Sequence, residues 1–224
     1  MANAGIEEIW ISKKSISSKY AKIILSKLNE KNIPYNIISE KIIRQISDSL
    51  NDQGIIAITN MPNYTQYIKP PKESIYFDGI SDPGNMGTLL RTAAWFGIKS
   101  IFLSPTCVDP FNSKVIRSAM GAHFYFSHFE YILNDDLFIN LNKHKVEILG
   151  SDIKGNSINN LNYKIPIKWC LILGNESHGI SKSIQKHITN TVSIPGFTNI
   201  ESLNVSIAGG ILMNILTLKK AVTK

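Results

Sequence analysis

Three segments, far apart in the sequence, combine polar side chains with small residues at the expected ends of strands. Residues 82–91 read DPGNMGTLLR, residues 171–180 read LILGNESHGI, and residues 194–206 read IPGFTNIESLNVS. Together they offer a guanidinium, a carboxylate, amides and a hydroxyl, with glycines that admit a ligand close to the backbone. The candidate catalytic residues among them are Arg91, Asn85, Glu176, Ser202 and Asn204.

The first segment predicts a turn at residues 82–87 that opens a helix. A helix N-terminus presents free N–H groups, which suit an anion. The segment lacks the Gly-Lys-Ser/Thr of a P-loop, and a lone Gly-x-x-Gly does not indicate a dinucleotide site. Because apolar residues flank Arg91, we expect a half-buried guanidinium paired with a phosphate or carboxylate, with a surface ion pair as the alternative. For Asn85 the alternative is a plain turn-former.

The second and third segments hold residues that each have two interpretations. Glu176 follows a buried strand and is expected to position another group, whereas a solvated loop side chain is the alternative. Ser202 is predicted to cap the last helix. Asn204 would then fall in the first helical turn, where asparagine is unfavourable, which indicates a role in the site. Gly209 and Gly210 cost about 1 kcal/mol each inside a helix, so they predict a close approach by another segment or a ligand.

The charge of the chain favours a polyanionic partner, nucleic acid first. The 224 residues carry a formal net charge of +7, although lysine-rich proteins can also be merely soluble. Only three of the 24 basic residues are arginines, so an arginine here suggests a need for its planar fork. Six early lysines form either a phosphate-contacting surface or a solvated face. They are Lys13, Lys14, Lys19, Lys22, Lys27 and Lys31.

Several classes of protein are disfavoured by composition. No apolar run reaches the roughly 18 residues of a membrane span, and no signal-peptide pattern opens the chain, so we expect a cytoplasmic protein with no membrane partner. Cys107 and Cys170 form no disulfide framework and are expected to be reduced core thiols. The five histidines show no metal-ligand spacing, and no Ser-His-Asp arrangement is indicated, so no metal is expected.

The apolar pattern predicts an α/β protein whose larger part is a parallel sheet covered on both faces. A small α/β domain is predicted at residues 1–68, a proline-stiffened linker at 69–73, and the sheet domain at 74–224. In the first domain we expect strands at 6–11, 35–38 and 54–59 and helices at 18–31 and 41–50. In the second we expect strands at 74–77, 101–103, 124–126, 146–149, 169–173 and 191–194, and helices at 87–96, 113–120, 183–187 and 203–220.

In this order and spacing, the three segments resemble the motifs of the SpoU/TrmH family of RNA ribose methyltransferases, in the SPOUT superfamily. Residues 85–91 resemble its Asn-x-Gly…Arg motif, and residues 171–180 resemble its Gly-x-Glu-x-x-Gly loop. Residues 194–208 resemble its Ile-Pro…Ser-Leu-Asn-Val-Ser-x-Ala stretch, and the similarity covers roughly residues 73–220. One such motif alone is weak, but three in order are specific.

The resemblance implies a fold and a cofactor that composition does not show. Family members have a deep trefoil knot at the C-terminus, a rare exception to the rule that chains do not thread loops. They bind S-adenosylmethionine in that knot. By resemblance, Gly174, Ile194 and Leu203 would contact the cofactor largely through backbone groups, with Ser151 near the adenosine.

The resemblance also implies partners. Family members are typically homodimers packed through the last helix, and the apolar face formed by Ile207, Ile211, Ile215 and Leu218 suits this, although burial within one subunit would give the same pattern. The N-terminal part resembles, more loosely, the ribosomal-protein-like RNA-binding domain of many members. It departs from that domain in lacking the opening Gly-x-x-x-Val helix and in having Asp52 where the usual His-Gln-Gly begins.

The implied reaction is attack by a ribose 2′-oxygen on the sulfonium methyl group. The family proposal makes the arginine, here Arg91, the general base, but a guanidinium pKa above 12 opposes this. Either the site lowers that pKa, or Arg91 stays charged and stabilises the developing alkoxide. Ribosomal RNA is favoured as the substrate over transfer RNA because of the extra domain. A catalytically inactive RNA-binding protein and a generic flavodoxin-like nucleotide enzyme are the remaining alternatives.

Overall fold

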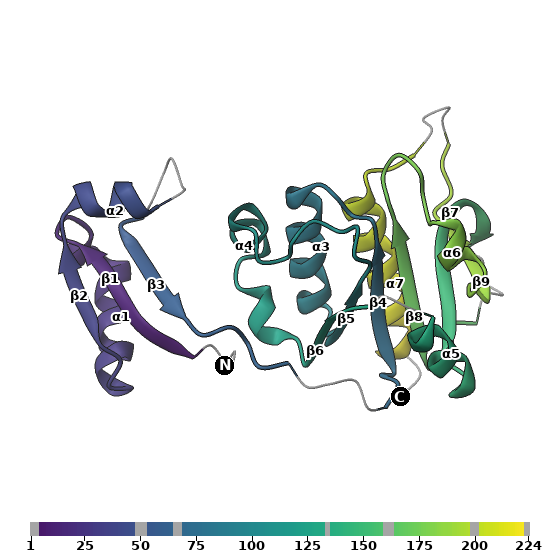
Figure 1. Ribbon diagram of the computed structural model, residues 1–224, viewed down its shortest axis with the longest axis horizontal. Coiled ribbons are helices and arrows are strands. Elements are labelled where there is room, and N and C mark those ends of the chain that lie inside the picture. Colours follow the sequence, from purple (N-terminus) through teal and green to yellow (C-terminus); the bar gives the residue numbers. More distant parts are fainter. Residues whose placement is uncertain are drawn as a thin grey trace. The chain divides into compact units, whose positions relative to one another are not determined.

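The computed structural model describes residues 5–47, 53–64, 69–132, 135–158, 164–197 and 202–221. The chain divides into two compact units, Met1–Asn63 and Tyr64–Lys224 (Figure 1). Each unit has its own sheet and its own apolar cluster.

The first unit is a three-stranded sheet with a helix packed against it. The strand order is β2 (Tyr35–Ile38), β1 (Ile6–Ser12), β3 (Ile55–Thr59), with β1 parallel to β2 and antiparallel to β3. Alternate β1 residues Ile9 and Ile11 are buried together with Leu28 of α1 (Lys19–Glu30). Serines begin both helices of the unit, because Ser18 and Ser39 accept hydrogen bonds from the first turns of α1 and α2 (Glu40–Ile46). A short 3₁₀ turn, η1 (Ser15–Ser17), precedes α1.

The second unit confirms the predicted parallel sheet. It has six strands in the order β6-β5-β4-β8-β7-β9, and every neighbouring pair is parallel. The strands are β4 (Glu73–Asp78), β5 (Ser100–Leu103), β6 (His128–Tyr131), β7 (Glu147–Ser157), β8 (Trp169–Gly174) and β9 (Asn190–Ser193). The helices are α3 (Pro83–Trp95), α4 (Ser113–Ala119), α5 (Asp136–Lys143), α6 (Lys182–Gln185) and α7 (Val205–Ala221).

Helices cover both faces of this sheet, as continuous apolar strands predict (Figure 1). Alternate residues of β8 separate the two faces, since Leu171 and Leu173 join one core cluster whereas Ile172 joins the other. The first cluster also contains residues of α3, α4 and α7, and the second contains residues of α5 and α6. The helix that carries Arg91 and the last helix therefore lie on the same face.

Two elements of this unit differ from the prediction. The strand predicted at residues 124–126 is wrong, because residues 124 and 125 belong to a 3₁₀ turn at Ala122–Tyr125, Phe126 ends that turn, and the edge strand β6 follows it. That strand, with sequence HFEY, alternates polar and apolar residues and so lacks the apolar run by which the buried strands were recognised. Helix α5, with three buried residues on one side, was not predicted.

Helix α3 begins four residues earlier than predicted. Asp82 is its N-cap, and Oδ1 of Asp82 accepts a hydrogen bond from the backbone N–H of Asn85, with 2.7 Å between the oxygen and the nitrogen. Pro83 occupies the first helical position. Proline suits this position because its φ is already helical and its missing N–H would have no partner. Asn85 therefore lies in the first turn of a helix and not in a preceding loop.

Cys107 and Cys170 are both free, and Cys170 is buried, where desolvation raises its pKa to about 12. Among the described residues no helix is long and apolar enough to cross a membrane, and no group of histidine, cysteine or acidic residues could hold a metal ion.

Part of the connection from β9 to α7, residues 198–201, lies outside the described chain. The trefoil knot thus stays a prediction.

Candidate active site

Two of the three polar segments begin side by side at one edge of the sheet. The last residues of the neighbouring parallel strands β4 and β8 are Asp78 and Gly174, and they are register partners. Ligands of such sheets bind beyond the carboxyl ends of the strands. Helix α7 packs on α3 and on β8, which brings the third segment to the same edge.

A chain of side-chain hydrogen bonds joins all three segments. The Asn85 amide nitrogen donates to Oε1 of Glu176 at 2.6 Å, and the Asn204 amide nitrogen donates to Oδ1 of Asn85 at 3.0 Å. A carboxylate can only accept, so Glu176 fixes which end of the Asn85 amide faces Asn204. The structure therefore brings Asn85, Glu176 and Asn204 together, as the sequence predicts. The two hydrogen bonds also fix the orientation of both amide groups.

The last helix is capped by a residue other than the one predicted. Oδ1 of Asn204 accepts from the N–H of Ser206 at 2.9 Å, and the Asn204 carbonyl accepts from Ala208 at 2.9 Å, so Asn204 immediately precedes α7 and caps it. The cap predicted at Ser202 is wrong. Ser202 lies two residues earlier and is exposed. Asn204 thereby holds both the helix end and Asn85.

Arg91 is exposed, so the predicted half-buried position is wrong. The apolar neighbours Leu89, Leu90 and Ala93 occupy the buried side of α3, and the 100° step per residue turns Arg91 outward beside exposed Thr88. No hydrogen bond or ion pair links its guanidinium to another described residue. Helical side chains lean toward the N-terminus, which directs Arg91 toward the turn that carries Asn85. The fork is therefore available to a substrate.

The loop that carries Glu176 is closed on itself. Asn175 and Gly179 exchange backbone hydrogen bonds of 3.0 and 2.9 Å, and the Asn175 amide nitrogen donates to the carbonyl of Gly79 at 2.8 Å. A Cβ on Gly174 would lie 2.4 Å from the carbonyl carbon of Gly179, so no side chain fits there. These contacts tie the loop to the end of β4.

Asp78 was missed by the sequence analysis. Its carboxylate is 5% exposed, and Oδ2 accepts from the Ser181 N–H at 2.7 Å, just beyond the Glu176 loop. Because Gly79 holds the start of this loop and Asp78 holds its end, two successive residues position Glu176. The signal in the sequence was an acidic residue directly after the apolar run 74–77.

Removing the acceptor at Asp78 should loosen the loop. We expect Asp78→Ala to remove the hydrogen bond from the N–H of exposed Ser181, to cost about 1 kcal/mol of unfolding free energy, and to lower kcat more than it raises KM for RNA. Asp78→Asn keeps an acceptor oxygen and should retain most of both. Thermal unfolding and steady-state kinetics on the two variants measure this. Equal losses in both variants would show that the negative charge matters and the hydrogen bond does not.

Glu176 can be tested by a similar pair. Glu176→Gln preserves an acceptor for Asn85, whereas Glu176→Ala frees the Asn85 amide. We expect kcat to fall about tenfold or more in the alanine variant, and less in the glutamine variant, because a lost hydrogen bond to a charged group costs about 1.5–3 kcal/mol. Cofactor affinity, measured by calorimetry, should change little. A larger effect on cofactor affinity than on kcat would make Glu176 a cofactor residue.

Two of the four expected cofactor residues lie at strand ends, whereas Ser151, predicted at a strand end, lies inside β7 (Glu147–Ser157) and Leu203 precedes the last helix. Ser151 is half-buried where β7 bulges, Gly174 ends β8, Ile194 follows β9, and Leu203 is 49% exposed before α7. Strands β8, β7 and β9 are neighbours, so their ends share one edge of the sheet. Gly174, Ile194 and Leu203 have no polar side-chain atoms and can offer only backbone groups as polar contacts, which fits a cofactor held mainly by the backbone, and Ser151 adds a hydroxyl.

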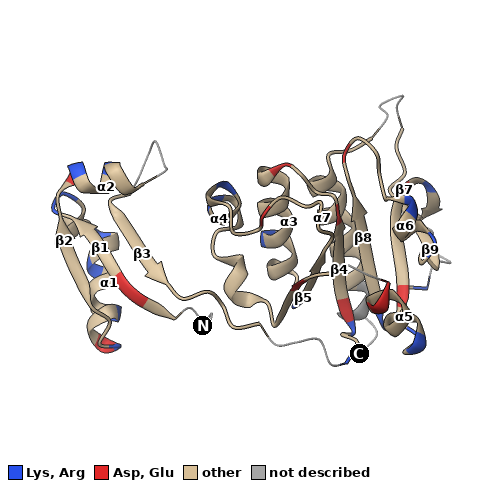
Figure 2. Cartoon of the chain, in the orientation of Figure 1, with Lys and Arg blue, Asp and Glu red and all other residues tan. Residues whose placement is uncertain are grey.

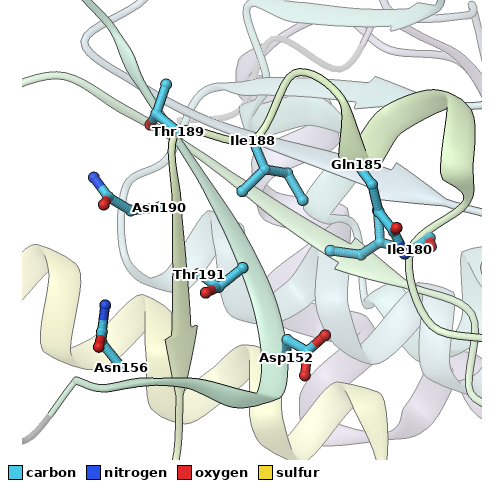
Figure 3. Close-up of a pocket in the computed structure, with 8 residues that line it drawn as sticks. All are labelled: Asp152, Asn156, Ile180, Gln185, Ile188, Thr189, Asn190 and Thr191. Atoms are coloured by element: carbon cyan, nitrogen blue, oxygen red, sulfur yellow. Dashed lines mark hydrogen bonds between the residues drawn. The ribbon is translucent and has the colours of Figure 1, made fainter.

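A cavity of about 440 Å³ lies next to this edge (Figure 3). Ile180, Gln185 and Ile188 line it on one side, and Asp152 from β7 and Thr191 from β9 on the other. None of the four expected cofactor residues is among its lining residues. Asp152 follows Ser151 directly, so the cavity adjoins the expected cofactor region from the face of the sheet that α6 covers.

Comparisons with known proteins agree with this geometry. Residues 72–214 match the model of the SpoU rRNA Methylase family, and residues 1–65 match a model described as RNA 2′-O ribose methyltransferase substrate binding. The chain is 29% identical over 188 residues to the 23S rRNA (guanosine(2553)-2′-O)-methyltransferase RlmP of Bacillus subtilis, covering 82% of this chain and 73% of that protein. It is 26% identical over 225 residues to the 23S rRNA (guanosine-2′-O-)-methyltransferase RlmB of Neisseria meningitidis, covering 92% and 88%.

Solved structures share the fold. The SpoU methyltransferase AviRb of Streptomyces viridochromogenes, in complex with AdoMet, superposes with a TM-score of 0.81 at 18% identity and covers 99% of this chain and 85% of that one. An AdoMet-bound rRNA methyltransferase of Sinorhizobium meliloti gives a TM-score of 0.79 at 23% identity, covering 97% and 82%. With its main unit matched over most of its length by the family model, and its three motifs joined at one edge of the sheet, the chain belongs to the SpoU rRNA methylase family.

Proposed function

We propose that this protein methylates a ribose 2′-hydroxyl of RNA, with S-adenosylmethionine as the methyl donor. The observation that carries the proposal is the Glu176–Asn85–Asn204 chain of hydrogen bonds, whose central residue Asn85 lies on the helix that also presents the free guanidinium of Arg91. When bound, the cofactor supplies an electrophilic methyl group on a sulfonium. The protein must orient the ribose, manage the proton of its 2′-hydroxyl and balance the negative charge that forms on the oxygen.

Arg91 suits the last of these tasks. In the reaction the 2′-oxygen bonds to the methyl carbon, the carbon–sulfur bond breaks with its electron pair left on sulfur, and the hydroxyl proton passes to solvent water. A charged guanidinium donates in a planar fork to a phosphate or to the developing alkoxide. Because a guanidinium offers only hydrogen-bond donors and no acceptor, we favour the stabiliser over the general base. Asn85, Glu176, Ser202 and Asn204 then position the ribose and Arg91, and Ser151, Gly174, Ile194 and Leu203 hold the cofactor.

Further parts of the proposal concern substrate, assembly and location. Ribosomal RNA is favoured over transfer RNA by the names of two relatives, and the matched substrate-binding model supports an RNA substrate. We propose residues 1–68 as the RNA-binding domain, 69–73 as a linker and 74–224 as the methyltransferase domain. The exposure of Ile207 and Leu218 on α7 supports a homodimer through this helix. We also propose a cytoplasmic location.

The test is transfer of labelled methyl from S-adenosylmethionine to unmodified ribosomal RNA and, separately, to transfer RNA. The RNA is then digested to nucleosides and the labelled product is identified by chromatography and mass. A 2′-O-methylated nucleoside from the ribosomal pool is the expected result. Label found only in transfer RNA would make transfer RNA the substrate, and label on a base would reject methylation of the ribose. If the protein binds the cofactor but transfers no methyl group to ribosomal RNA, to transfer RNA or to assembling ribosomal subunits, the result would favour an inactive RNA-binding protein.

A further inference from the structure

Positive charge gathers where the elements of the first unit meet at one edge. Lys13 and Lys14 follow β1, Lys19 and Lys22 lie in the first turn of α1, and Lys41 lies in the first turn of α2. All five are exposed. We call this set, Lys13, Lys14, Lys19, Lys22 and Lys41, the basic edge.

The opposite end of the same unit carries the acidic residues. Glu7 and Glu8 lie near the start of β1, and Glu30 ends α1, where Lys27 and Lys31 accompany it. Figure 2 shows blue segments where α1 and α2 begin, and red segments where β1 begins and α1 ends. The described part of the unit is thus polarised along its strands.

The backbone under the basic edge is held by inward-facing hydrogen bonds. The Lys13 N–H donates to the carbonyl of Ile38 at 3.1 Å, and the Lys14 N–H donates to Oε1 of Glu40 at 2.8 Å. The Lys14 N–H also lowers the pKa of Glu40, the one carboxylate among the described residues at this edge. Both contacts use backbone atoms of the lysines and leave the ammonium groups to solvent.

The start of β3 supports the same turn from the other side. Ser12 is 2% exposed, and its hydroxyl donates to Oγ of Ser15, whose own hydroxyl donates to the carbonyl of Gln53 at 3.0 Å. Gly54 has a φ of +71°, and a Cβ on it would lie 2.1 Å from Oγ of Ser15, so only glycine closes the turn this tightly. A rigid turn that presents lysines loses little conformational entropy when it binds a partner.

We infer that the basic edge is the surface of the first unit on which the RNA backbone docks; this rests on the proposed function. Lysine ammonium groups are point charges that suit phosphates without reading sequence. Tyr20, 62% exposed beside Lys19, offers an aromatic face on which an unpaired base could stack. The other lysines of α1 lie toward the acidic end and carry no part of the docking.

The experiment compares two variants that remove equal charge from the same unit. Lys13→Gln/Lys19→Gln alters the basic edge, and Lys27→Gln/Lys31→Gln is the matched control. Binding of the full-length protein to unmodified ribosomal RNA is measured at several salt concentrations. We expect the first variant to bind about tenfold more weakly and to lower the slope of log Kd against log salt by about 1 to 2, since each lost phosphate contact removes nearly one unit. The control should stay within twofold of the unaltered protein.

Methyl transfer separates this inference from the proposed function. Affinity for S-adenosylmethionine, measured without RNA, should be the same in both variants as in the unaltered protein, and Lys27→Gln/Lys31→Gln should also keep its rate of methyl transfer, because these two lysines lie outside the basic edge and outside the catalytic unit. If both variants weaken RNA binding equally, or neither does, the docking surface is wrong. If the unaltered protein binds RNA with the expected contrast but transfers no methyl group, the proposed function fails while the docking surface stands.

Discussion

Replacing Arg91 by alanine should lower kcat for methyl transfer by about 10²- to 10³-fold, the usual loss when one donor to a developing oxyanion is removed. Arg91 is exposed on α3 with no partner among the described residues, so its removal should leave the fold intact. Affinity for S-adenosylmethionine should stay within about twofold. Single-turnover transfer of labelled methyl to RNA measures the first effect, and calorimetry measures the second.

Arg91→Lys distinguishes the fork from the charge. Lysine keeps the positive charge but cannot form two parallel hydrogen bonds to one anion, so we expect nearly the same loss as in the alanine variant. Arg117→Ala is the matched control, because Arg117 is also exposed, on the neighbouring helix α4, and is assigned no role in the reaction. Turnover of Arg91→Lys at the rate of the unaltered protein would reject any special role for the guanidinium.

Gly174→Ala should be among the most destabilising single-methyl additions in this chain. Gly174 is buried, and a Cβ there would lie 2.4 Å from the carbonyl carbon of Gly179 and 2.5 Å from the backbone nitrogen of Ile180. Backbone cannot swing aside as a side chain can. We expect a loss of about 3 kcal/mol of unfolding free energy, the upper end for overpacked cores. For a unit of this size that lowers Tm by roughly 6–12 °C.

The control for this variant is Gly196→Ala. A Cβ on Gly196 would meet nothing within 4 Å, and the residue is exposed, so its stability should change by less than about 0.5 kcal/mol. Thermal unfolding followed by circular dichroism compares the two. Methyl transfer should fall in Gly174→Ala even below its Tm, because the displaced loop carries Glu176. An unchanged Tm in Gly174→Ala would mean that the loop can open without cost.

The sheet was predictable because the sequences of its buried strands are uninterrupted runs of mainly apolar residues. Strands β4 and β8 lie in the interior of the sheet with helices on both faces, and both were predicted close to their observed limits. The edge strand β6 meets solvent and alternates polar with apolar residues, so its pattern was too short to separate from a turn. Burial on two faces, and not strand propensity, made the difference.

The members of the site were predictable, but their contacts were not. Asn85, Glu176 and Asn204 were singled out by type and by position at strand ends. Ser202 and Asn204 are both favourable N-cap residues. Local residue preferences do not decide at which of the two α7 begins, because the two starting points differ by less than one helical turn. The exposure of Arg91 depends on which side of α3 packs against α7 and α4, which is a tertiary property.

The bond between Asn204 and Asn85 joins residues 119 positions apart, and the bond between Asn85 and Glu176 spans 91. While the ribosome is still making the chain, α3 and its arginine leave the exit tunnel long before the segment that completes this network. A nascent chain therefore exposes the lysines of its first unit while the amides of Asn85 and Asn204 remain unmatched. The network is complete only once α7 has been synthesised and has packed, so a stalled or truncated product lacks the arrangement on which the proposed activity rests.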